Sequence, residues 1–486
     1  MSATPAPPAA LRDIDPVPTL LARTAAELSA DFLASRPIRV SRAPGRLDVM
    51  GGIADYTGSL VCEWPLDRAA AVALQERDDR QFQLFSFNLY DEQRPFAFRI
   101  PLDALARQPA DVLRREFDEP GRKWAAYLAG CLFVLHEQGY VDLGDPIRRG
   151  INIALYSTVP LGAGVGSSGA IEVATMMNLV DHFGVRGEID GLKLAALCQA
   201  AENRIVGAPC GIMDQATSLL GEAGALLRMK CQPHEMLPPV LLPEGVRVVG
   251  INSNVKHDVG GPAYARTRCA AFMGHKLILE KMRQMGATVG RELIADPTSG
   301  YLANLDADDY KTFFRAHVPE SLSGREFIDR HGSTIDTVTT IEPDFSYPLR
   351  HAADHHVLEA RRVKRFVEFL GQAREQTGPR RKLAIDSAGH LMYASHQSYT
   401  MDAMLGADEC DLLVHLVRRR ESAGLYGAKI TGGGSGGTVA VLCDATDRAD
   451  AAIAQVLAEY KRQTGHQAEA FTGSSPGAWH VGTALV

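Results

Sequence analysis

The chain has 486 residues, of which 46% are hydrophobic and 22% charged, and this length is sufficient for about two or three domains with a full core. Its formal net charge of −7 and the absence of a basic stripe argue against nucleic acid and anionic membranes as partners. Eight scattered cysteines without a C-x-x-C pair, no secretory signal pattern and no run of about 18 apolar residues predict a cytoplasmic protein with reduced thiols.

The first half of the chain has the pattern of a mixed domain rich in strands. Apolar residues at helical spacing predict a helix over 20–36. Segments rich in β-branched or alternating apolar residues, bounded by Gly, Pro or Asp, are predicted to be strands over 38–52, 59–75, 80–88 and 151–160. The fourth of these strands leads into a glycine-rich turn and then a helix over 171–183. We expect one domain over residues 18–225.

The chain changes character from about residue 226, and we expect a second domain over 226–486. A strand pair near 247–255 precedes a helical stretch over 264–284. The polar segment at about 295–350 is too aromatic for a disordered linker and is interpreted as an irregular helical insertion without an assigned role.

A glycine-rich loop joins the fourth predicted strand to its helix. It contains Gly162, Gly164, Gly166, Ser167, Ser168 and Gly169. Glycines let the backbone approach an anion, and the first amide groups of a helix favour negative charge. The spacing matches neither a Walker loop nor a Rossmann fingerprint. A phosphate cradle and a plain tight turn are equal alternatives at this point.

A second glycine run, over 432–437, lies between two strand-like segments. Flexible linkers are rarely flanked in this way, so a closely approached backbone is the preferred interpretation.

The segment AENRIVGAPCGIMDQATS supplies two carboxylates. Glu202 ends a helical stretch, and Asp214 follows a turn that redirects the chain toward the same cleft. One carboxylate is suited to binding Mg²⁺ together with a serine hydroxyl, and the other to orienting or deprotonating a hydroxyl group. For Asp214, a helix N-cap is an equal alternative.

Five segments together resemble the successive motifs of one enzyme family. They read APGRLDVMGGIADYTG, PLGAGVGSSGAIEVA, GAPCGIMDQ, NSNVKH with Tyr264, and KITGGGSGGTVAV, and they span residues 42 to 440. They resemble galactokinases of the GHMP kinase superfamily, and GRLDVMGGIADY and GYLANLDADDY are similar to the kinase domain of L-arabinokinases. The resemblance implies an α+β fold with two domains, one like ribosomal S5 domain 2 and the other ferredoxin-like.

The resemblance also implies roles for individual residues. The loop from Gly162 to Gly169 would wrap the triphosphate of ATP, and Trp124 would pack near the adenine. Ser168 and Glu202 would hold Mg²⁺. Asp214 would be the catalytic base or orienting carboxylate, and Arg46 would neutralise charge beside it and the transferring phosphoryl group.

The predicted sugar contacts are Asp55, Gly52, Ile53, Gly211 and Tyr264. Galactokinases have a Glu-His pair, near the sugar 6-hydroxyl, where this chain has Gly52 and Ile53. L-Arabinose has the ring configuration of galactose without that hydroxymethyl group, and burying an unpaired hydroxyl against Ile53 would cost on the order of 1 to 3 kcal/mol. We therefore expect ATP-dependent phosphorylation of the C1 hydroxyl of L-arabinose. A galactokinase and a non-catalytic sugar sensor are the alternatives.

Two histidines, His351 and His355, are four residues apart, a spacing that metal sites use. No third ligand is evident in the sequence at a suitable spacing, so we expect both on a solvated helix face.

Overall fold

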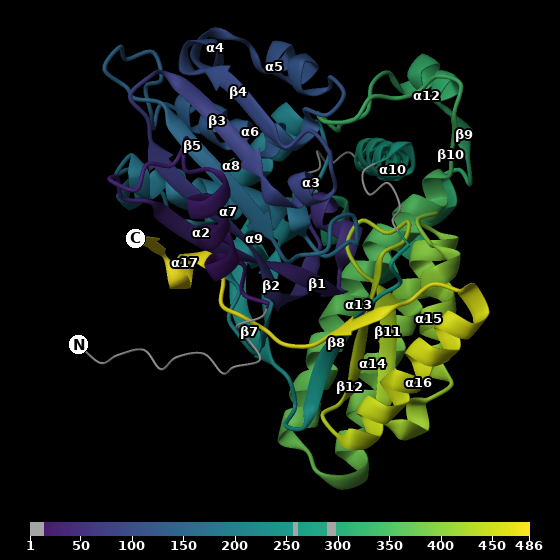
Figure 1. Ribbon diagram of the computed structural model, residues 1–486. Coiled ribbons are helices and arrows are strands. Elements are labelled where there is room, and N and C mark those ends of the chain that lie inside the picture. The colour runs from purple at the N-terminus through teal and green to yellow at the C-terminus, as the bar shows by residue number, and fades with distance from the viewer. Residues whose placement is uncertain (1–13, 256–260, 289–297) are drawn as a thin grey trace.

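The computed structural model describes residues 14–255, 261–288 and 298–486, and it shows two domains built on separate sheets (Figure 1). The N-terminal domain contains most of the purple, blue and teal elements, and the C-terminal domain contains the green helices and the yellow ones except α17. Within the described residues, no helix is both long enough and apolar enough to cross a membrane.

The N-terminal domain is built on an eight-stranded sheet in the order β14-β1-β2-β5-β3-β4, with β6 and β7 continuing from β2. Its strands are β1 (Arg39–Met50), β2 (Leu60–Glu76), β3 (Gln81–Ser86), β4 (Ala97–Pro101), β5 (Ile151–Ser157), β6 (Ala225–Lys230), β7 (Glu235–Leu241) and β14 (Thr483–Leu485). All pairs are antiparallel except β3 with β5. The four predicted strands are therefore confirmed as β1, β2, β3 and β5.

The helices of this domain pack against the sheet around one central helix, α7. They are α2 (Pro16–Glu27), α3 (Phe87–Asp91), α4 (Leu102–Arg107), α5 (Ala110–Phe117), α6 (Lys123–Glu137), α7 (Ser167–His182), α8 (Gly191–Ala201), α9 (Met213–Leu220) and α17 (Ala478–Val481), with the short turns η1 (Gly52–Thr57), η2 (Arg186–Glu188) and η3 (Glu202–Val206). Helix α7 is buried on most sides because its middle is apolar, and it contacts β1, β2, α6, α8 and α9. The N-terminus of α7 is thereby fixed in the interior, at the end of the glycine-rich loop. The predicted helix over 20–36 is shorter in the structure and ends at Glu27.

The C-terminal domain has a four-stranded antiparallel sheet in the order β11-β12-β8-β13. Its strands are β8 (Val246–Asn252), β11 (Leu425–Ile430), β12 (Thr438–Asp444) and β13 (Glu469–Phe471), and its helices are α10 (Pro262–Thr288), α13 (Leu349–Glu375), α14 (Gly378–Met401), α15 (Asp408–Arg418) and α16 (Asp447–Thr464), with the turn η7 (Glu421–Ala423). This order and the intervening helices give the βαββαβ arrangement of a ferredoxin-like domain.

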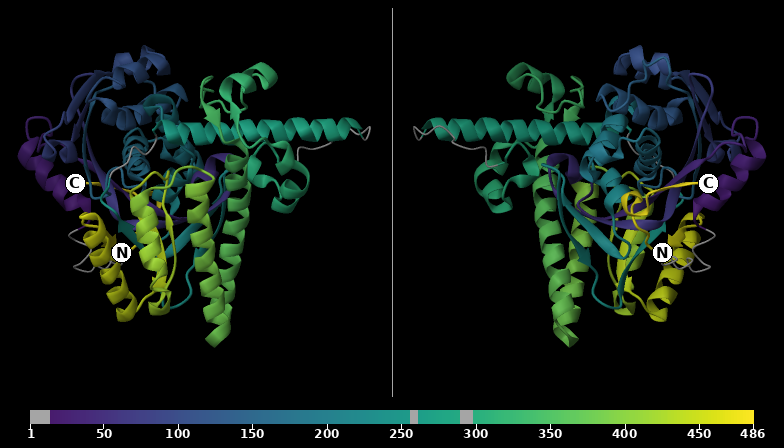
Figure 2. Two further views of the ribbon diagram at one scale, coloured as in Figure 1. Left: turned by 90° about the vertical axis from the view of Figure 1, so that its right-hand side faces the viewer. Right: turned by 90° about the vertical axis from the view of Figure 1, so that its left-hand side faces the viewer.

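The insertion consists of short helices and also contains one two-stranded pair that the sequence analysis did not predict. The elements are η4 (Leu302–Asn304), α11 (Ala307–Asp309), η5 (Tyr310–Phe314), η6 (Arg315–His317), β9 (Leu322–Ser323), α12 (Gly324–His331) and β10 (Ser346–Tyr347). They lie on both sides of α10, which runs out to one side of the molecule, while the α13–α14 hairpin points in another direction (Figure 2). Residues 295–297 of the predicted insertion lie outside the described residues.

The predicted domain boundary at residue 225 requires correction. Strands β6 and β7 pair with each other and with β2, so the first sheet continues to Leu241 and the second begins at Val246. At the C-terminus, β14 pairs with β1 and returns the chain to the first domain. The change of composition near residue 226 marks a hairpin of the first sheet and not its end.

Candidate active site

One cavity of about 270 Å³ lies between the two domains and is lined by most of the predicted site residues. The predicted residues that line it are Arg46, Asp55, Gly162, Gly164, Gly166, Ser167, Ser168, Glu202, Gly211, Asp214 and Tyr264. Four other predicted residues, Gly52, Ile53, Gly169 and Trp124, are not part of its lining.

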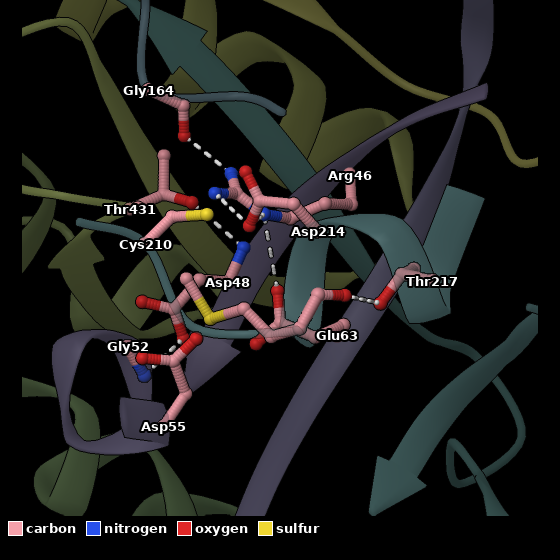
Figure 3. Close-up of polar contacts among 12 residues, drawn as sticks. Arg46, Asp48, Gly52, Asp55, Glu63, Gly164, Cys210, Asp214, Thr217 and Thr431 are labelled. Carbon is pink, nitrogen blue, oxygen red and sulfur yellow. Dashed lines mark hydrogen bonds and ion pairs between the residues drawn. The ribbon is translucent and has the colours of Figure 1, made fainter. Parts of the chain in front are cut away.

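Arg46, on β1, is the centre of the site's ionic network (Figure 3). Its Nε and Nη2 both donate to Asp214 Oδ1, at 2.9 and 2.7 Å, and its Nη1 donates to the carbonyl oxygen of Gly164 at 2.5 Å. The Glu63 carboxylate lies 3.5 Å from Nε on the other side. Arg46 is only 2% exposed, so these are buried ionic contacts and not a surface salt bridge. The arginine links the glycine-rich loop to the candidate catalytic carboxylate.

The glycine-rich loop depends on backbone conformations that other residues rarely adopt. Gly162, Gly164 and Gly166 all have φ near +70°, in the left-handed region, and α7 begins at Ser167 immediately after them. The amide groups of the first turn of α7 therefore open toward the cavity with the positive end of the helix dipole. This arrangement favours the phosphate cradle over a turn with no further role.

The second glycine run packs against the first one, backbone to backbone. A Cβ atom on Gly432 would lie 2.5 Å from the carbonyl oxygen of Gly164, and one on Gly437 would lie 2.4 Å from that of Ala163. Side chains are excluded at both positions, which agrees with the predicted close approach and not with a flexible linker. The C-terminal domain thus closes over the glycine-rich loop.

Asp214 lies in the first turn of α9, whose N-cap is Ile212, so the N-cap alternative for this aspartate is excluded. Its side chain is pressed against α7, since a Cβ on Gly169 would lie 2.9 Å from the Asp214 Cβ. Gly169 therefore leaves space for the Asp214 side chain and does not itself line the cavity.

Asp55, in the turn η1, lies on the opposite side of the same cavity. Gly211 is packed directly against it, because a Cβ at Gly211 would lie 1.8 Å from Asp55 Oδ2. Burial, followed by the charge of Asp214, raises the pKa of Asp55 from 3.8 to about 7, although Arg268 and two backbone amides act in the other direction. A ligand that donates hydrogen bonds to Asp55 would favour its ionised form.

Glu202 and Ser168 form the candidate metal site. Burial and the Asp214 charge raise the pKa of Glu202 to about 7, while hydrogen bonds from Ser168, Cys210 and Gln215 lower it. Gln215 Nε2 donates to Glu202 Oε2 at 2.7 Å. In the part of the chain that the structure describes, Glu202 has no cationic partner and no set of three His, Cys, Asp or Glu side chains is arranged to hold a metal. Two hard oxygen donors fit Mg²⁺, which usually keeps waters and substrate phosphates among its ligands.

The loop that carries Gly52 and Ile53 is held from outside the cavity. Ile53 is 1% exposed and packs in the core of the C-terminal domain, while its amide donates to Tyr399 Oη at 2.9 Å. A Cβ on Gly52, where φ is +47°, would lie 1.6 Å from the same Oη. Tyr399 therefore fills the space that a side chain at position 52 would need.

The same turn is held from its other side by α13. His356 hydrogen-bonds Tyr56 Oη and Thr57 Oγ1, at 3.2 and 2.9 Å. The preceding His355 is fully buried and lies 2.9 Å from Ser398 Oγ, so the prediction of a solvated face is wrong for this residue. The reason is that this face of α13 packs under η1 and α14.

Two aromatic residues of α6 bear on the predicted contact with the adenine. Tyr127 lines the cavity and Trp124, three residues earlier, does not. The indole Nε1 of Trp124 is buried and has no hydrogen-bond partner among the described residues. Tyr127 was missed in the sequence, although its i+3 position after Trp124 places it on the same side of the helix.

Three further residues that shape the site had weak or no signals in the sequence. Glu63 is a carboxylate inside the apolar strand β2, a pattern that suggests a buried partner. Gln215 directly follows Asp214 and bridges Glu202 to Glu172, donating to the latter at 3.0 Å. Tyr399 had no sequence signal, because it reaches the site only through tertiary packing.

Comparison with known proteins identifies the family. The model of the GHMP kinases N terminal domain matches residues 126–222, and that of the GHMP kinases C terminal matches residues 381–462. A galactokinase of Streptomyces coelicolor is 30% identical over 431 residues, which cover 87% of this chain and 89% of that protein. The chain belongs to the GHMP kinases.

Two further relatives indicate which kind of GHMP kinase this chain resembles. The L-arabinokinase of Arabidopsis thaliana is 36% identical over an alignment of 498 positions. The alignment covers 92% of this chain but 46% of that protein, so the chain spans about half of its length. The crystal structure of Lactococcus lactis galactokinase complexed with galactose has the same fold, with a TM-score of 0.69 at 21% identity over 97% of this chain and all of that one. The protein is a sugar kinase of the galactokinase and L-arabinokinase type.

Proposed function

We propose that this enzyme transfers the γ-phosphoryl group of ATP to the C1 hydroxyl of L-arabinose, giving L-arabinose 1-phosphate and ADP. One observation carries the proposal: a single cavity joins Arg46, Asp214 and the glycine-rich loop to Asp55, Gly211 and Tyr264. The first group suits a triphosphate and the second suits the hydroxyl groups of a sugar.

The two oxygens of Asp214 have different environments. Arg46 donates twice to Oδ1, which leaves Oδ2 free of the arginine and facing Gly166. In the proposed reaction, Oδ2 orients the C1 hydroxyl and accepts its proton as the oxygen attacks the γ-phosphorus and the bond to the ADP oxygen breaks. Arg46, the amides of α7 and the loop glycines stabilise the negative charge of the transferring group.

Ser168 and Glu202 would hold Mg²⁺, whose charge helps neutralise the phosphate oxygens. Ser168 and Glu202 line the same cavity, and Ser168 lowers the pKa of the Glu202 carboxyl. Binding of a cation would favour ionised Glu202, against the effect of its burial.

The preference for a pentose is supported by the turn that carries Gly52 and Ile53 and by the similarity to an L-arabinokinase. Tyr399 Oη occupies the space beside Gly52, and Ile53 points into the core, so these two positions offer no polar side chain to a C6 hydroxyl. The similarity to an L-arabinokinase points to the same sugar.

D-Galactose is the second candidate, supported by galactokinases that match nearly the whole of this chain and by the shared fold. The free state of all eight cysteines agrees with the proposed cytoplasmic location.

The test is an ADP-release assay with purified protein, ATP and Mg²⁺, in which kcat/KM is compared for L-arabinose, D-galactose and several epimers. A preference for L-arabinose of tenfold or more is expected. A preference for D-galactose would replace the proposed sugar and retain the kinase assignment.

A further inference from the structure

We infer that Arg268 of α10 and Asp336 of the insertion form a positioning pair for the loop 207–212, which we call the sugar-binding loop. Through this pair the insertion acts on sugar affinity and not on nucleotide binding. The inference rests on the proposed function only in placing the sugar against Asp55 and Gly211.

The pair is a buried, two-pronged ion pair. Arg268 Nε and Nη2 donate to the two oxygens of Asp336, at 2.9 and 2.8 Å, and the two side chains are 7% and 2% exposed. Asp336 is fixed in turn by Thr339, whose hydroxyl donates to Oδ2 at 2.6 Å, and by the amide of Val338 at 3.2 Å. A planar guanidinium held this way has one remaining direction in which to donate.

The remaining nitrogen of Arg268 points to the sugar-binding loop. Nη1 donates to the carbonyl oxygen of Pro209 at 3.1 Å and to that of Cys210 at 3.5 Å. These two residues immediately precede Gly211, whose Cα is packed against Asp55. A shift of the two carbonyls would therefore move Gly211 relative to the carboxylate.

Arg268 also contacts the other elements of the sugar side. Its guanidinium lies over the ring of Tyr56, 5.0 Å from the centroid, and Tyr56 follows Asp55 in η1. Tyr264, which lines the cavity, lies one turn earlier on α10. The charge of Arg268 opposes the rise in the Asp55 pKa. One side chain thus connects the loop, η1 and α10, and Asp336 holds it in place.

Within the described residues, no hydrogen bond or ion pair joins the glycine-rich loop to Arg268 or Asp336; the loop instead contacts Arg46 and the second glycine run. Loss of the ion pair should therefore affect the two substrates unequally. A residue that merely stabilised the fold would not discriminate between them.

The experiment compares Asp336→Asn, which removes the charge at constant shape, with Asp344→Asn. Asp344 belongs to the same insertion, is 89% exposed and pairs with Arg325 at the surface. We expect Asp336→Asn to raise KM for the sugar by about five- to fiftyfold, with changes below about twofold in KM for ATP and in kcat. Asp344→Asn should match the wild type. Equal losses for both substrates, or an unchanged sugar KM, would overturn the inference.

A second readout does not depend on catalysis. Hydrogen–deuterium exchange of the ligand-free protein should be faster over 207–212 in Asp336→Asn and unchanged over 162–166. If Asp336→Asn proves too unstable, Arg268→Lys, which cannot make the fork, should give the same selective increase. Unchanged exchange over 207–212 in both variants would overturn the inference. A wild-type protein that phosphorylates no sugar would contradict the proposed function and leave this measurement valid.

Discussion

The cavity has two sides that are built in different ways. The proposed phosphate side consists of the glycine-rich loop, Arg46, Asp214 and Glu202, and its geometry comes from left-handed glycines, a helix terminus and short ionic contacts. The proposed sugar side consists of Asp55, Gly211 and Tyr264 with the loop at Gly52 and Ile53. It is held by Tyr399, His356 and Arg268, which lie far away in the sequence. The glycine-rich loop and the helix terminus of the first side have local sequence signals, although Arg46 and Asp214 meet only through tertiary packing. The supports of the second side have no local signal at all.

The largest effect is expected on the phosphate side. Asp214→Ala should lower kcat by about 10²- to 10⁴-fold, because the attacking hydroxyl loses its proton acceptor. Binding of nucleotide, measured by calorimetry, should remain within a few fold of wild type. The control is Glu222→Ala, an exposed carboxylate just after the same helix. Near-normal turnover of Asp214→Ala would remove this residue from the mechanism.

A methyl group at Gly211 tests the sugar side. A Cβ 1.8 Å from Asp55 Oδ2 forces the loop and the carboxylate apart, so Gly211→Ala should raise KM for the sugar by about ten- to a hundredfold. Steady-state kinetics with each substrate varied in turn would separate this effect from any change in KM for ATP. Gly187→Ala is the matched control, since that glycine is exposed and a Cβ there meets nothing within 4 Å. An unchanged sugar KM would show that the close contact is not needed for binding.

The raised pKa of Asp55 predicts a pH dependence of stability. Because the folded state holds this proton up to about pH 7 and the unfolded state only to about 3.8, the group's contribution falls as pH rises between these values. From pH 5 to pH 8 the ligand-free protein should lose about 2 to 3 kcal/mol of unfolding free energy from Asp55. Asp55→Asn should lack this loss, and the difference between the two denaturation profiles isolates it from Glu202. Parallel profiles would contradict the raised pKa.

The smallest effect is expected at Tyr399, which holds the turn of Gly52 and Ile53 from outside the cavity. Tyr399→Phe removes the acceptor of the Ile53 amide and the donor to the Gly432 carbonyl. Leaving a buried amide unpaired should cost about 1 to 3 kcal/mol of stability, measured by urea denaturation. The sugar KM should rise more than the ATP KM. Tyr393→Phe, on the same helix but beside Arg418, is the control.

The close approach of Tyr399 to Gly52 determines how a change of sugar specificity should be designed. Restoring a Glu-His pair at Gly52 and Ile53 alone places a side chain on Tyr399 Oη, 1.6 Å from the new Cβ. We therefore expect Gly52→Glu with Ile53→His to lose activity toward both sugars. Adding Tyr399→Ala should recover activity toward galactose relative to L-arabinose. Recovery of galactose activity without the third change would contradict the proposed role of Tyr399.

The sequence could predict those parts of the molecule that depend on neighbouring residues. Strand β1, the glycine-rich loop and α7 follow from alternation, glycine spacing and helical periodicity. Contacts such as Tyr399 with Ile53, or Asp336 with Arg268, join residues far apart and have no local signature. For the same reason His355, interpreted as solvated, is buried, and the hairpin of β6 and β7 was assigned to the wrong domain.

The most direct test of the account is the position of the new phosphate on the sugar. The wild-type enzyme should be incubated with ATP, Mg²⁺ and L-arabinose labelled with ¹³C at C1, and the product examined by ¹³C and ³¹P NMR. We predict a phosphorus-split C1 signal, because the C1 hydroxyl faces Asp214 Oδ2 in the proposed arrangement. Phosphate on another carbon, or ATP hydrolysis without a sugar phosphate, would contradict the assignment of Asp214 and Asp55 to the two ends of one bound sugar.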